Sequence, residues 1–155
     1  MEYSIRKARE NDIENNLLNI FIKGYMLHHN NRPDKFSSKT DEGLKDILIE
    51  SIRRDKILVI EYQNKIIGYA SYQIKEKNFD KFLWVDELVI DDNFQGEGFG
   101  KIIINKLEEL SKKEECKSTE FCCWEFNKKA QEIYKHLGYK VQRIIYEKEV
   151  DPRNI

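Results

Sequence analysis

A short stretch rich in glycine holds the groups of this chain best suited to bind an anion. It runs from Gln95 to Lys101, and Gly96, Gly98 and Gly100 alternate along it. Glycine lets backbone N–H groups come close to a ligand, and the start of a following helix adds a partial positive charge. The stretch therefore predicts a phosphate-binding turn. An ordinary connection between a strand and a helix is the alternative.

The spacing within this turn excludes one common nucleotide site and argues against another. A P-loop needs Ser or Thr after its Gly-Lys pair to bind magnesium, whereas Ile102 follows Lys101 and position 95 is Gln. A dinucleotide fingerprint has the order G-x-G-x-x-G on the first strand of its fold, whereas the glycines here alternate and come late in the chain. A phosphate-bearing ligand of another kind is therefore expected.

Hydrophobic spacing predicts the elements that position this turn. Apolar runs with a period of two predict strands, and apolar residues three and four apart predict helices. Asn11 with Glu14 is typical of a capping box, and the polar stretch 26–40 is typical of a loop. Strands are expected at 3–8, 57–60, 66–74, 82–90, 119–124 and 139–146, and helices at 11–25, 41–54, 98–110 and 127–137. This order predicts one α/β domain over residues 1–155, in which 82–124 forms a β-α-β unit.

Composition narrows the class of protein and of partner. Hydrophobic residues make up 40% and charged residues 35% of the chain, and the net charge is −1. These values are typical of a globular protein and argue against nucleic acid or an anionic membrane as the main partner. Every apolar run is shorter than the ~20 residues of a membrane span, and the N-terminus lacks the apolar core of a signal peptide. We therefore expect a cytoplasmic protein.

The cysteines and histidines lack the spacing of a metal site. Cys116, Cys122 and Cys123 are odd in number, and no C-x2-C or H-x3-H pattern joins them to the histidines. We expect neither a metal nor a disulfide framework. The simpler role for the three thiols is that of small hydrophobic side chains.

Two motifs together resemble those of the GNAT superfamily of acyl-CoA N-acyltransferases. Residues 95–100 match the pattern Q/R-x-x-G-x-G/A, and residues 127–139 match N-x-x-A-x-x-x-Y-x-x-x-G-[FY]. The expected order of elements also agrees with that family along nearly the whole chain. The resemblance implies a mixed, mostly antiparallel central sheet flanked by helices, in which two strands splay apart to form a cofactor cleft.

The resemblance also implies how acetyl-CoA would bind. Its pantetheine arm would pair with the backbone of Leu88, Val89 and Ile90, as an added strand does. Its pyrophosphate would lie on the backbone N–H groups of the turn, where Lys101 would add a charge contact, and the Asn127 side chain would reach the pantetheine amide. The turn comprises Gln95, Gly96, Glu97, Gly98, Phe99, Gly100 and Lys101. Exposure of Lys101 to solvent and helix capping by Asn127 are the alternatives.

The implied reaction is direct attack of a primary amine on acetyl-CoA in a ternary complex, since none of the cysteines lies where this family has a nucleophile. Tyr134 matches the family tyrosine and is the expected general acid, although a role as a core aromatic would also explain it. Asp86 and Glu87 are the candidate bases because an alkylamine with a pKa of ~10 must lose a proton before it attacks. Neighbours on a strand face opposite sides, so both reach one cleft only across a bulge. We favour Glu87 slightly.

Two further segments bear on the acceptor and on the assembly. His29, Arg32 and Phe36 fall in the expected loop on the acceptor side, which suits a small-molecule amine or a peptide amine; a surface pair of Arg32 with Asp34 is the alternative. A homodimer through the C-terminal strands is expected because 144–146 would leave an apolar edge. A non-catalytic CoA-binding or sensor module remains the alternative function.

Overall fold

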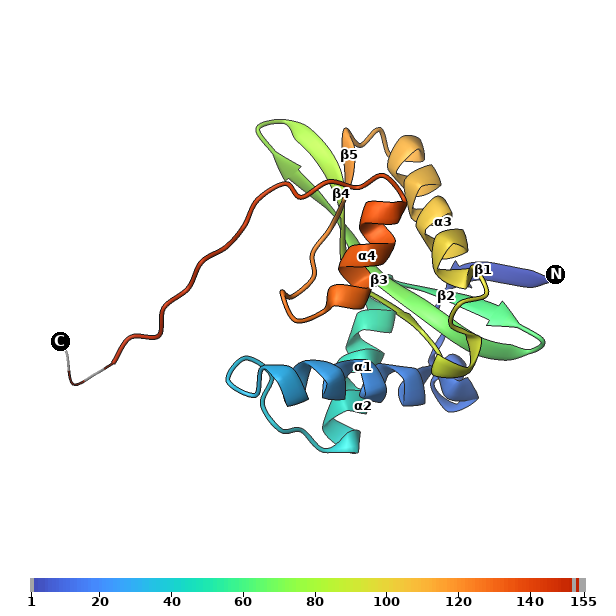
Figure 1. The fold of residues 1–155 in the computed structure, drawn as a ribbon. Helices are drawn as coiled ribbons and strands as arrows, with labels where there is room; N and C mark the ends of the chain where they lie inside the picture. The colour runs from blue at the N-terminus through green and yellow to red at the C-terminus, as the bar shows by residue number, and fades with distance from the viewer. Residues whose placement is uncertain (1, 152, 154–155) are drawn as a thin grey trace.

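The computed structural model describes residues 2–151 and 153, which form a sheet with helices on both faces (Figure 1). The sheet contains β1 (Tyr3–Lys7), β2 (Ile57–Tyr62), β3 (Lys65–Lys77), β4 (Asp80–Ile90) and β5 (Ser118–Phe121), in that spatial order. All neighbouring pairs are antiparallel except β4 and β5, which are parallel. The predicted mixed, mostly antiparallel sheet is therefore confirmed.

Two cores lie on the two faces of the sheet because successive strand residues point to opposite sides. On β2, Val59 packs with helices α1 (Leu18–Asn31) and α2 (Asp41–Arg53), whereas Leu58 packs with α3 (Phe99–Lys113). The fourth helix, α4 (Lys128–His136), lies on the same side as α3 (Figure 1). The cleft described below therefore has α1 on one side and α4 on the other.

The first helix differs from its prediction at both ends. A 3-10 turn (Glu10–Asp12) and a π-helical turn (Ile13–Leu17) precede it. The capping bond runs from the backbone N–H of Arg9 to the Asp12 carboxylate, so the predicted capping box of Asn11 with Glu14 is wrong. At its other end, α1 continues through the polar residues 26–31, which were expected to be a loop. Polar side chains fit the exposed face of a helix, so only Pro33, which disfavours helix just before it, marks the true end.

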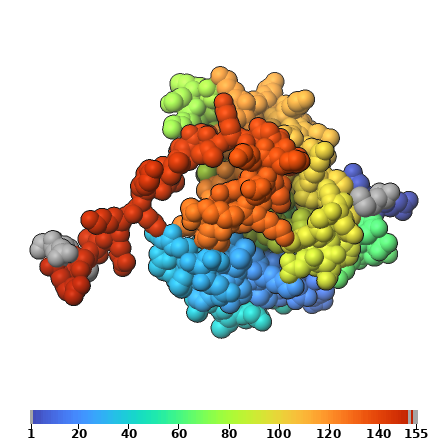
Figure 2. All heavy atoms as spheres, in the orientation of Figure 1, coloured from blue at the N-terminus to red at the C-terminus, as the bar shows by residue number. Residues whose placement is uncertain are grey.

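The last predicted strand, residues 139–146, is absent. This segment is extended, but it joins no strand ladder among the residues that the structure describes. A strand needs a neighbour to pair its backbone, and an alternating pattern alone does not supply one. We call residues 140–151 the C-terminal arm, which extends away from the body of the molecule in Figures 1 and 2.

No helix within residues 2–151 is long and apolar enough to cross a membrane.

Candidate active site

The site begins where β4 separates from β5. The two strands pair from Phe82 with Ser118 to Val85 with Phe121, and the N–H of Cys122 then donates weakly to the carbonyl of Val85 at 3.4 Å. Beyond this point β4 continues to Ile90 and pairs only with β3. The expected splay is present, and the backbone of β4 faces an open space there.

A bulge in β4 lies at the same point. Ser71 on β3 pairs with Glu87, and the next residue, Tyr72, pairs with Val85, so Asp86 is the extra residue. A bulge interrupts the alternation of side chains along a strand. Both neighbouring carboxylates consequently line the space between β4 and β5.

The separated strands border a cleft of about 820 Å³, a size that suits a large cofactor. Its walls come from α1, the end of β4, the glycine turn, the segment 122–124 and α4. Of the residues predicted to act here, the following line it: Asp86, Glu87, Leu88, Val89, Ile90, Gln95, Gly96, Gly98, Phe99, Gly100, Asn127, Tyr134 and Phe36. Glu97, Lys101, His29 and Arg32 do not.

The glycine turn presents unpaired backbone N–H groups. Gly96 and Gly98 have φ values of 79° and 90°, and a Cβ atom on either would meet nothing within 4 Å, so the backbone conformation alone explains these glycines. The first hydrogen bond of α3 runs from the N–H of Ile102 to the carbonyl of Gly98 at 3.2 Å. The preceding N–H groups at the helix start are therefore available to an anion.

The side chain of Gln95 holds this turn in place. Its amide nitrogen donates to the carbonyl of Ile90 and to Asp92, both at 3.1 Å, and its oxygen accepts from Lys129 of α4. Lys129 thus brings a positive charge to the turn. Lys129 was not predictable from the sequence, because only the fold brings α4 beside Gln95.

A strained residue positions the end of β4. Asn16, with φ of 77° inside the π-helical turn, donates to the carboxylate of Asp91 at 2.7 Å and to the carbonyl of Ile66 at 2.9 Å. Burial alone would raise the pKa of Asp91, but the bonds from the Asn93 N–H and from Asn16 lower it overall. Asp91 therefore stays ionised at the mouth of the turn. Sequence reasoning missed this pair.

The carboxylate of Glu87 is held by a tyrosine. The hydroxyl of Tyr69 donates to Glu87 Oε2 at 2.5 Å, and the Tyr69 side chain is fully buried. Within residues 2–151, no hydrogen bond reaches the other oxygen, Oε1. Every buried side-chain polar atom there has a hydrogen-bond partner, so the unbonded Oε1 is not buried. Glu87 lines the cleft, and Oε1 is therefore open to it. Burial raises the pKa of Glu87, which the bond from Tyr69 and the nearby His28 partly offset.

Asp86 meets a different environment. It is exposed, and its two oxygens accept from Trp84 Nε1 at 2.9 Å and from Gln73 Nε2 at 3.2 Å. Both Asp86 oxygens thus already accept hydrogen bonds, whereas Glu87 Oε1 has no partner among the described residues. Of the two candidate bases, the geometry favours Glu87.

Tyr134 on α4 projects into the cleft. Its ring packs on Phe121 with centroids 4.5 Å apart. No described residue forms a hydrogen bond with its hydroxyl. Because no buried polar atom among these residues lacks a partner, this hydroxyl is not buried and opens to the cleft, as Glu87 Oε1 does. Burial, followed by the thiols of Cys123 and Cys122, raises the pKa of Tyr134, so the hydroxyl keeps its proton. Asn127 caps α4 by accepting from the N–H of Ala130 at 3.3 Å.

Aromatic side chains form the end of the cleft away from the glycine turn. Phe36 packs on His28 and Trp124 with centroids 4.9 and 5.5 Å apart. His28 Nδ1 bonds the carbonyl of Gly24 at 2.7 Å, so the neutral ring carries its proton there and Nε2 is free to accept. His29 was the predicted acceptor-side residue, but helix α1 places His28 on the cleft instead.

His29 and Arg32 support this wall from behind. His29 Nδ1 bonds the carbonyl of Phe36 at 2.7 Å. Arg32 lies 5.0 Å from the Trp124 ring and pairs with Asp34 at 2.8 Å and with Glu147 at 2.5 Å. The alternative of an Arg32–Asp34 pair is thus present, and it lies outside the cleft lining.

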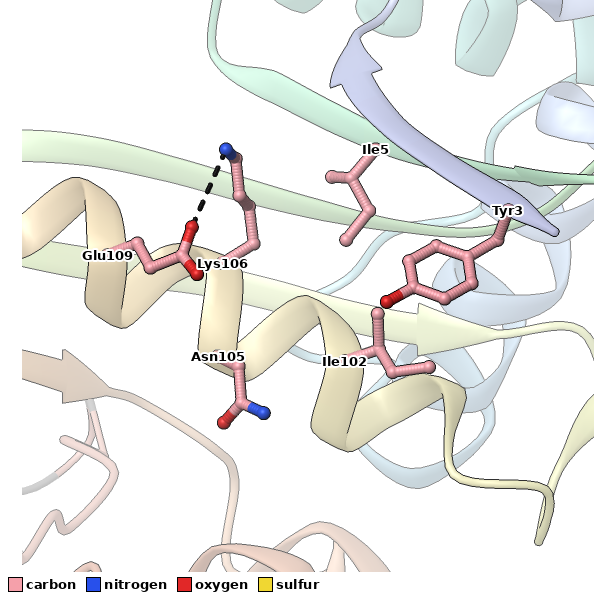
Figure 3. A pocket seen from close by; sticks show the side chains of 6 residues that line it. All are labelled: Tyr3, Ile5, Ile102, Asn105, Lys106 and Glu109. Carbon is pink, nitrogen blue, oxygen red and sulfur yellow. Dashed lines mark ion pairs between the residues drawn. The ribbon is translucent and has the colours of Figure 1, made fainter. Parts of the chain in front are cut away.

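A second hollow of about 340 Å³ lies between β1 and α3, away from these groups (Figure 3). Its walls include Tyr3, Ile5 and Ile102, and its one ion pair joins Lys106 to Glu109 at 3.7 Å. Among the described residues, no group of three or more His, Cys, Asp or Glu side chains could hold a metal ion. The groups suited to chemistry therefore gather in the β4–β5 cleft.

The sequence model of the Acetyltransferase (GNAT) family matches residues 24–139, which include every wall of this cleft except Asn16 of the π-helical turn and the first part of α1. The chain belongs to the GNAT family. GNAT proteins use acetyl-CoA. Membership in the family therefore explains why this chain has both a separated pair of strands and a glycine turn beside one cleft.

Individual proteins extend the comparison. An uncharacterized N-acetyltransferase of Methanocaldococcus jannaschii is 26% identical over 92% of this chain and 63% of its own length. The spermine/spermidine N(1)-acetyltransferase of Bacillus subtilis is 29% identical over 51% of this chain and 55% of its own length. The chain thus spans about three fifths of the length of these relatives. An aminoglycoside N-acetyltransferase solved with CoA has the same fold, with a TM-score of 0.71 and 15% identity over 96% of this chain and 95% of its own.

Proposed function

We propose that this GNAT protein is an acetyl-CoA-dependent N-acetyltransferase that acetylates a primary amine of a small molecule or peptide by direct attack in a ternary complex. The observation that carries the proposal is the placement of two reactive groups from different elements in one cleft. Glu87 Oε1 from β4 and the Tyr134 hydroxyl from α4 both open to it without a partner among residues 2–151.

The cleft offers a separate subsite to each part of acetyl-CoA. Backbone groups of Leu88, Val89 and Ile90 on the edge of β4 away from β3 would bond the pantetheine amides, as in strand addition, and Gln95 already occupies the Ile90 carbonyl. The N–H groups of residues 95–101 would hold the pyrophosphate, with Lys129 adding charge. Asn127, at the start of α4, lies beside this path. Lys101 is exposed outside the cleft lining and would act only at longer range.

Proton movement in the proposed reaction follows from the two environments. Glu87 Oε1 accepts a proton from the ammonium, and the neutral nitrogen then forms a bond to the acetyl carbon while the carbon–sulfur bond breaks. The electron pair goes to sulfur, and the Tyr134 hydroxyl donates a hydrogen bond to the departing thiolate. The acylated nitrogen loses its second proton to that thiolate, so the products are the amide and the CoA thiol, and the first proton stays on Glu87 until it passes to water. A thiol pKa of ~8.5 lies below that of tyrosine. The raised pKa of Tyr134 therefore favours hydrogen bonding over complete proton transfer.

The acceptor would enter at the aromatic end of the cleft. Phe36 and Trp124 offer ring faces and edges, and Asp86 offers a carboxylate, which suits a cationic amine. His29 and Arg32 would act indirectly, by holding the Phe36 carbonyl and the outer face of Trp124. The spermine/spermidine and aminoglycoside specificities of the two named relatives make both kinds of amine suitable for testing.

A thiol-release assay over a panel of amines tests the proposal. The panel contains polyamines, aminoglycosides, amino sugars and peptides with free N-termini or lysines. We expect acetyl-CoA-dependent release of CoA with at least one class, matched by acetylated product in mass spectrometry. Tight acetyl-CoA binding without thiol release on any amine would instead favour a CoA-binding or sensor module.

A further inference from the structure

We propose that Tyr69 is a positioning residue for Glu87, because its buried hydroxyl fixes one carboxylate oxygen and leaves the other directed at the amine. The inference rests on the proposed function, since it explains how the candidate base is made ready. The supporting geometry is independent of that function. It consists of the strand register, the burial of Tyr69 and the open Oε1 atom.

The register of β3 and β4 brings the two side chains together. Ser71 pairs with Glu87 and Tyr69 pairs with Val89, so Tyr69 lies diagonally across from Glu87 on the same face of the sheet. Diagonal neighbours are within reach of a long side chain. The bulge at Asp86 sets this register, so it selects which carboxylate Tyr69 can bond.

The surroundings leave the Tyr69 hydroxyl little freedom. The ring packs 6.1 Å from Phe21 within the core beneath α1, and a Cβ atom on Gly24 would lie 3.5 Å from the hydroxyl. The close approach of α1 therefore confines the hydroxyl from the side opposite the sheet. A buried hydroxyl needs a partner, and the bond to Oε2 supplies it.

The remaining titratable groups act on Glu87 in opposing directions. His28 on α1 and the bond from Tyr69 favour the ionised carboxylate, whereas Asp86 on β4 disfavours it. Cys122, Cys123 and Tyr134 line the cleft from the segment after β5 and from α4. Among the described residues, Tyr69 makes the one hydrogen bond to the carboxylate, and loss of this bond should raise the Glu87 pKa.

Carbon-13 NMR of glutamate carboxyl groups tests the coupling without turnover. The Glu87 signal is assigned by its loss in Glu87→Gln. We expect Tyr69→Phe, which keeps the ring, to raise the Glu87 pKa by about one pH unit. Tyr72→Phe is the matched control, because Tyr72 is a buried tyrosine of β3 that packs in the opposite core. An unchanged Glu87 titration in Tyr69→Phe would overturn the proposal.

Kinetics on an amine from the panel then test the consequence for the reaction. The acid limb of the kcat profile should move upward with the NMR titration in Tyr69→Phe and stay in place in Tyr72→Phe. In a Glu87→Gln background, Tyr69→Phe should change kcat less than twofold, because groups that act as a unit are non-additive. Equal losses in both backgrounds, or an unmoved limb, would mean that Tyr69 does not act through Glu87.

Failure of the proposed function can be distinguished from failure of the Tyr69–Glu87 coupling. If the wild-type protein acetylates no amine, the proposed function fails, but the NMR titration still decides whether Tyr69 controls Glu87. Tyr69→Phe could be too unstable to titrate, because it leaves the Glu87 carboxylate without its hydrogen bond. The double variant Tyr69→Phe with Glu87→Gln is then measured, since it no longer contains that carboxylate. Recovery of the melting temperature in that double variant supports the coupling, and a further additive loss contradicts it.

Discussion

Asp86 and Glu87 are adjacent in sequence, yet they meet environments that assign them different chemistry. Glu87 is bonded by a buried tyrosine and has one free oxygen, whereas Asp86 is exposed with both oxygens bonded. A carboxylate that is partly removed from water has a raised pKa, closer to the pH at which a general base is most effective. The two roles therefore follow from local structure that the sequence does not contain.

Glu87→Gln should lower kcat by about 100-fold or more, since the base is removed without a change in shape.

The same variant should alter the pH dependence of stability. Because the pKa of Glu87 is raised on folding, the folded state holds this proton more tightly than the unfolded state. The stabilising contribution is full below the unfolded pKa and is lost as pH rises through the folded one. The melting temperature of Glu87→Gln should therefore gain on wild type as pH rises from about 4 to 7. A constant difference across that range would contradict the raised pKa.

Tyr134→Phe should lower kcat by about 100-fold while leaving acetyl-CoA affinity nearly unchanged. The hydroxyl acts chiefly as charge develops on sulfur, and the phenyl ring keeps its packing on Phe121. Steady-state kinetics and calorimetric titration separate the two effects. A tyrosine with only a packing role would show full kcat in this variant.

At the scale of elements, the glycine turn and α3 should bind acetyl-CoA through backbone groups and charge. Gly98 has φ of 90° with open space around it, so Asn and Asp, which tolerate this conformation best, can both be placed there. Gly98→Asp should weaken acetyl-CoA binding at least tenfold more than Gly98→Asn, because only the carboxylate repels the pyrophosphate. Calorimetry on the two variants measures the difference. Equal affinities would place the pyrophosphate elsewhere.

The elements that could be predicted from sequence are those whose own residues determine them. The Thr40 cap begins α2, and its hydroxyl accepts from the N–H of Gly43 at 3.0 Å. The glycines of 95–100 likewise predict the turn, because their φ values require them. The end of α1 at Asn31 was not predictable from polarity, since exposed helix faces and loops share the same composition.

The parts of the site that sequence reasoning missed depend on contacts between distant segments. Asn16 reaches Asp91, Lys129 reaches Gln95 and Tyr69 reaches Glu87 only after the sheet has formed. No local pattern marks these residues. The bulge at Asp86 differs from these contacts, because it was named in advance as the condition for both carboxylates to reach one cleft. Only the pairing of two strands fixes its position, because register is a property of two strands together.

At the scale of the whole molecule, the C-terminal arm exposes apolar side chains that a single chain does not cover. Val141, Ile144, Ile145 and Tyr146 are between 67% and 90% exposed. Strand β5 pairs on one side only within the described residues, and the arm passes it where Gln142 donates to Glu120 at 2.8 Å. An extended apolar segment beside an open sheet edge favours pairing with another chain.

We therefore expect a homodimer in which each arm covers apolar surface of a second copy, since a symmetric exchange satisfies both open edges at once. Sedimentation at micromolar concentration should give about twice the chain mass of 18.6 kDa. Ile144→Asp with Ile145→Asp should shift the protein to the monomer, because two charges would replace the apolar contact. Lys148→Asp with Lys140→Asp is the matched control, since it adds the same carboxylates to the arm without removing apolar side chains. Sedimentation of the wild-type protein at the chain mass would contradict the dimer and would mean that the arm does not join two copies.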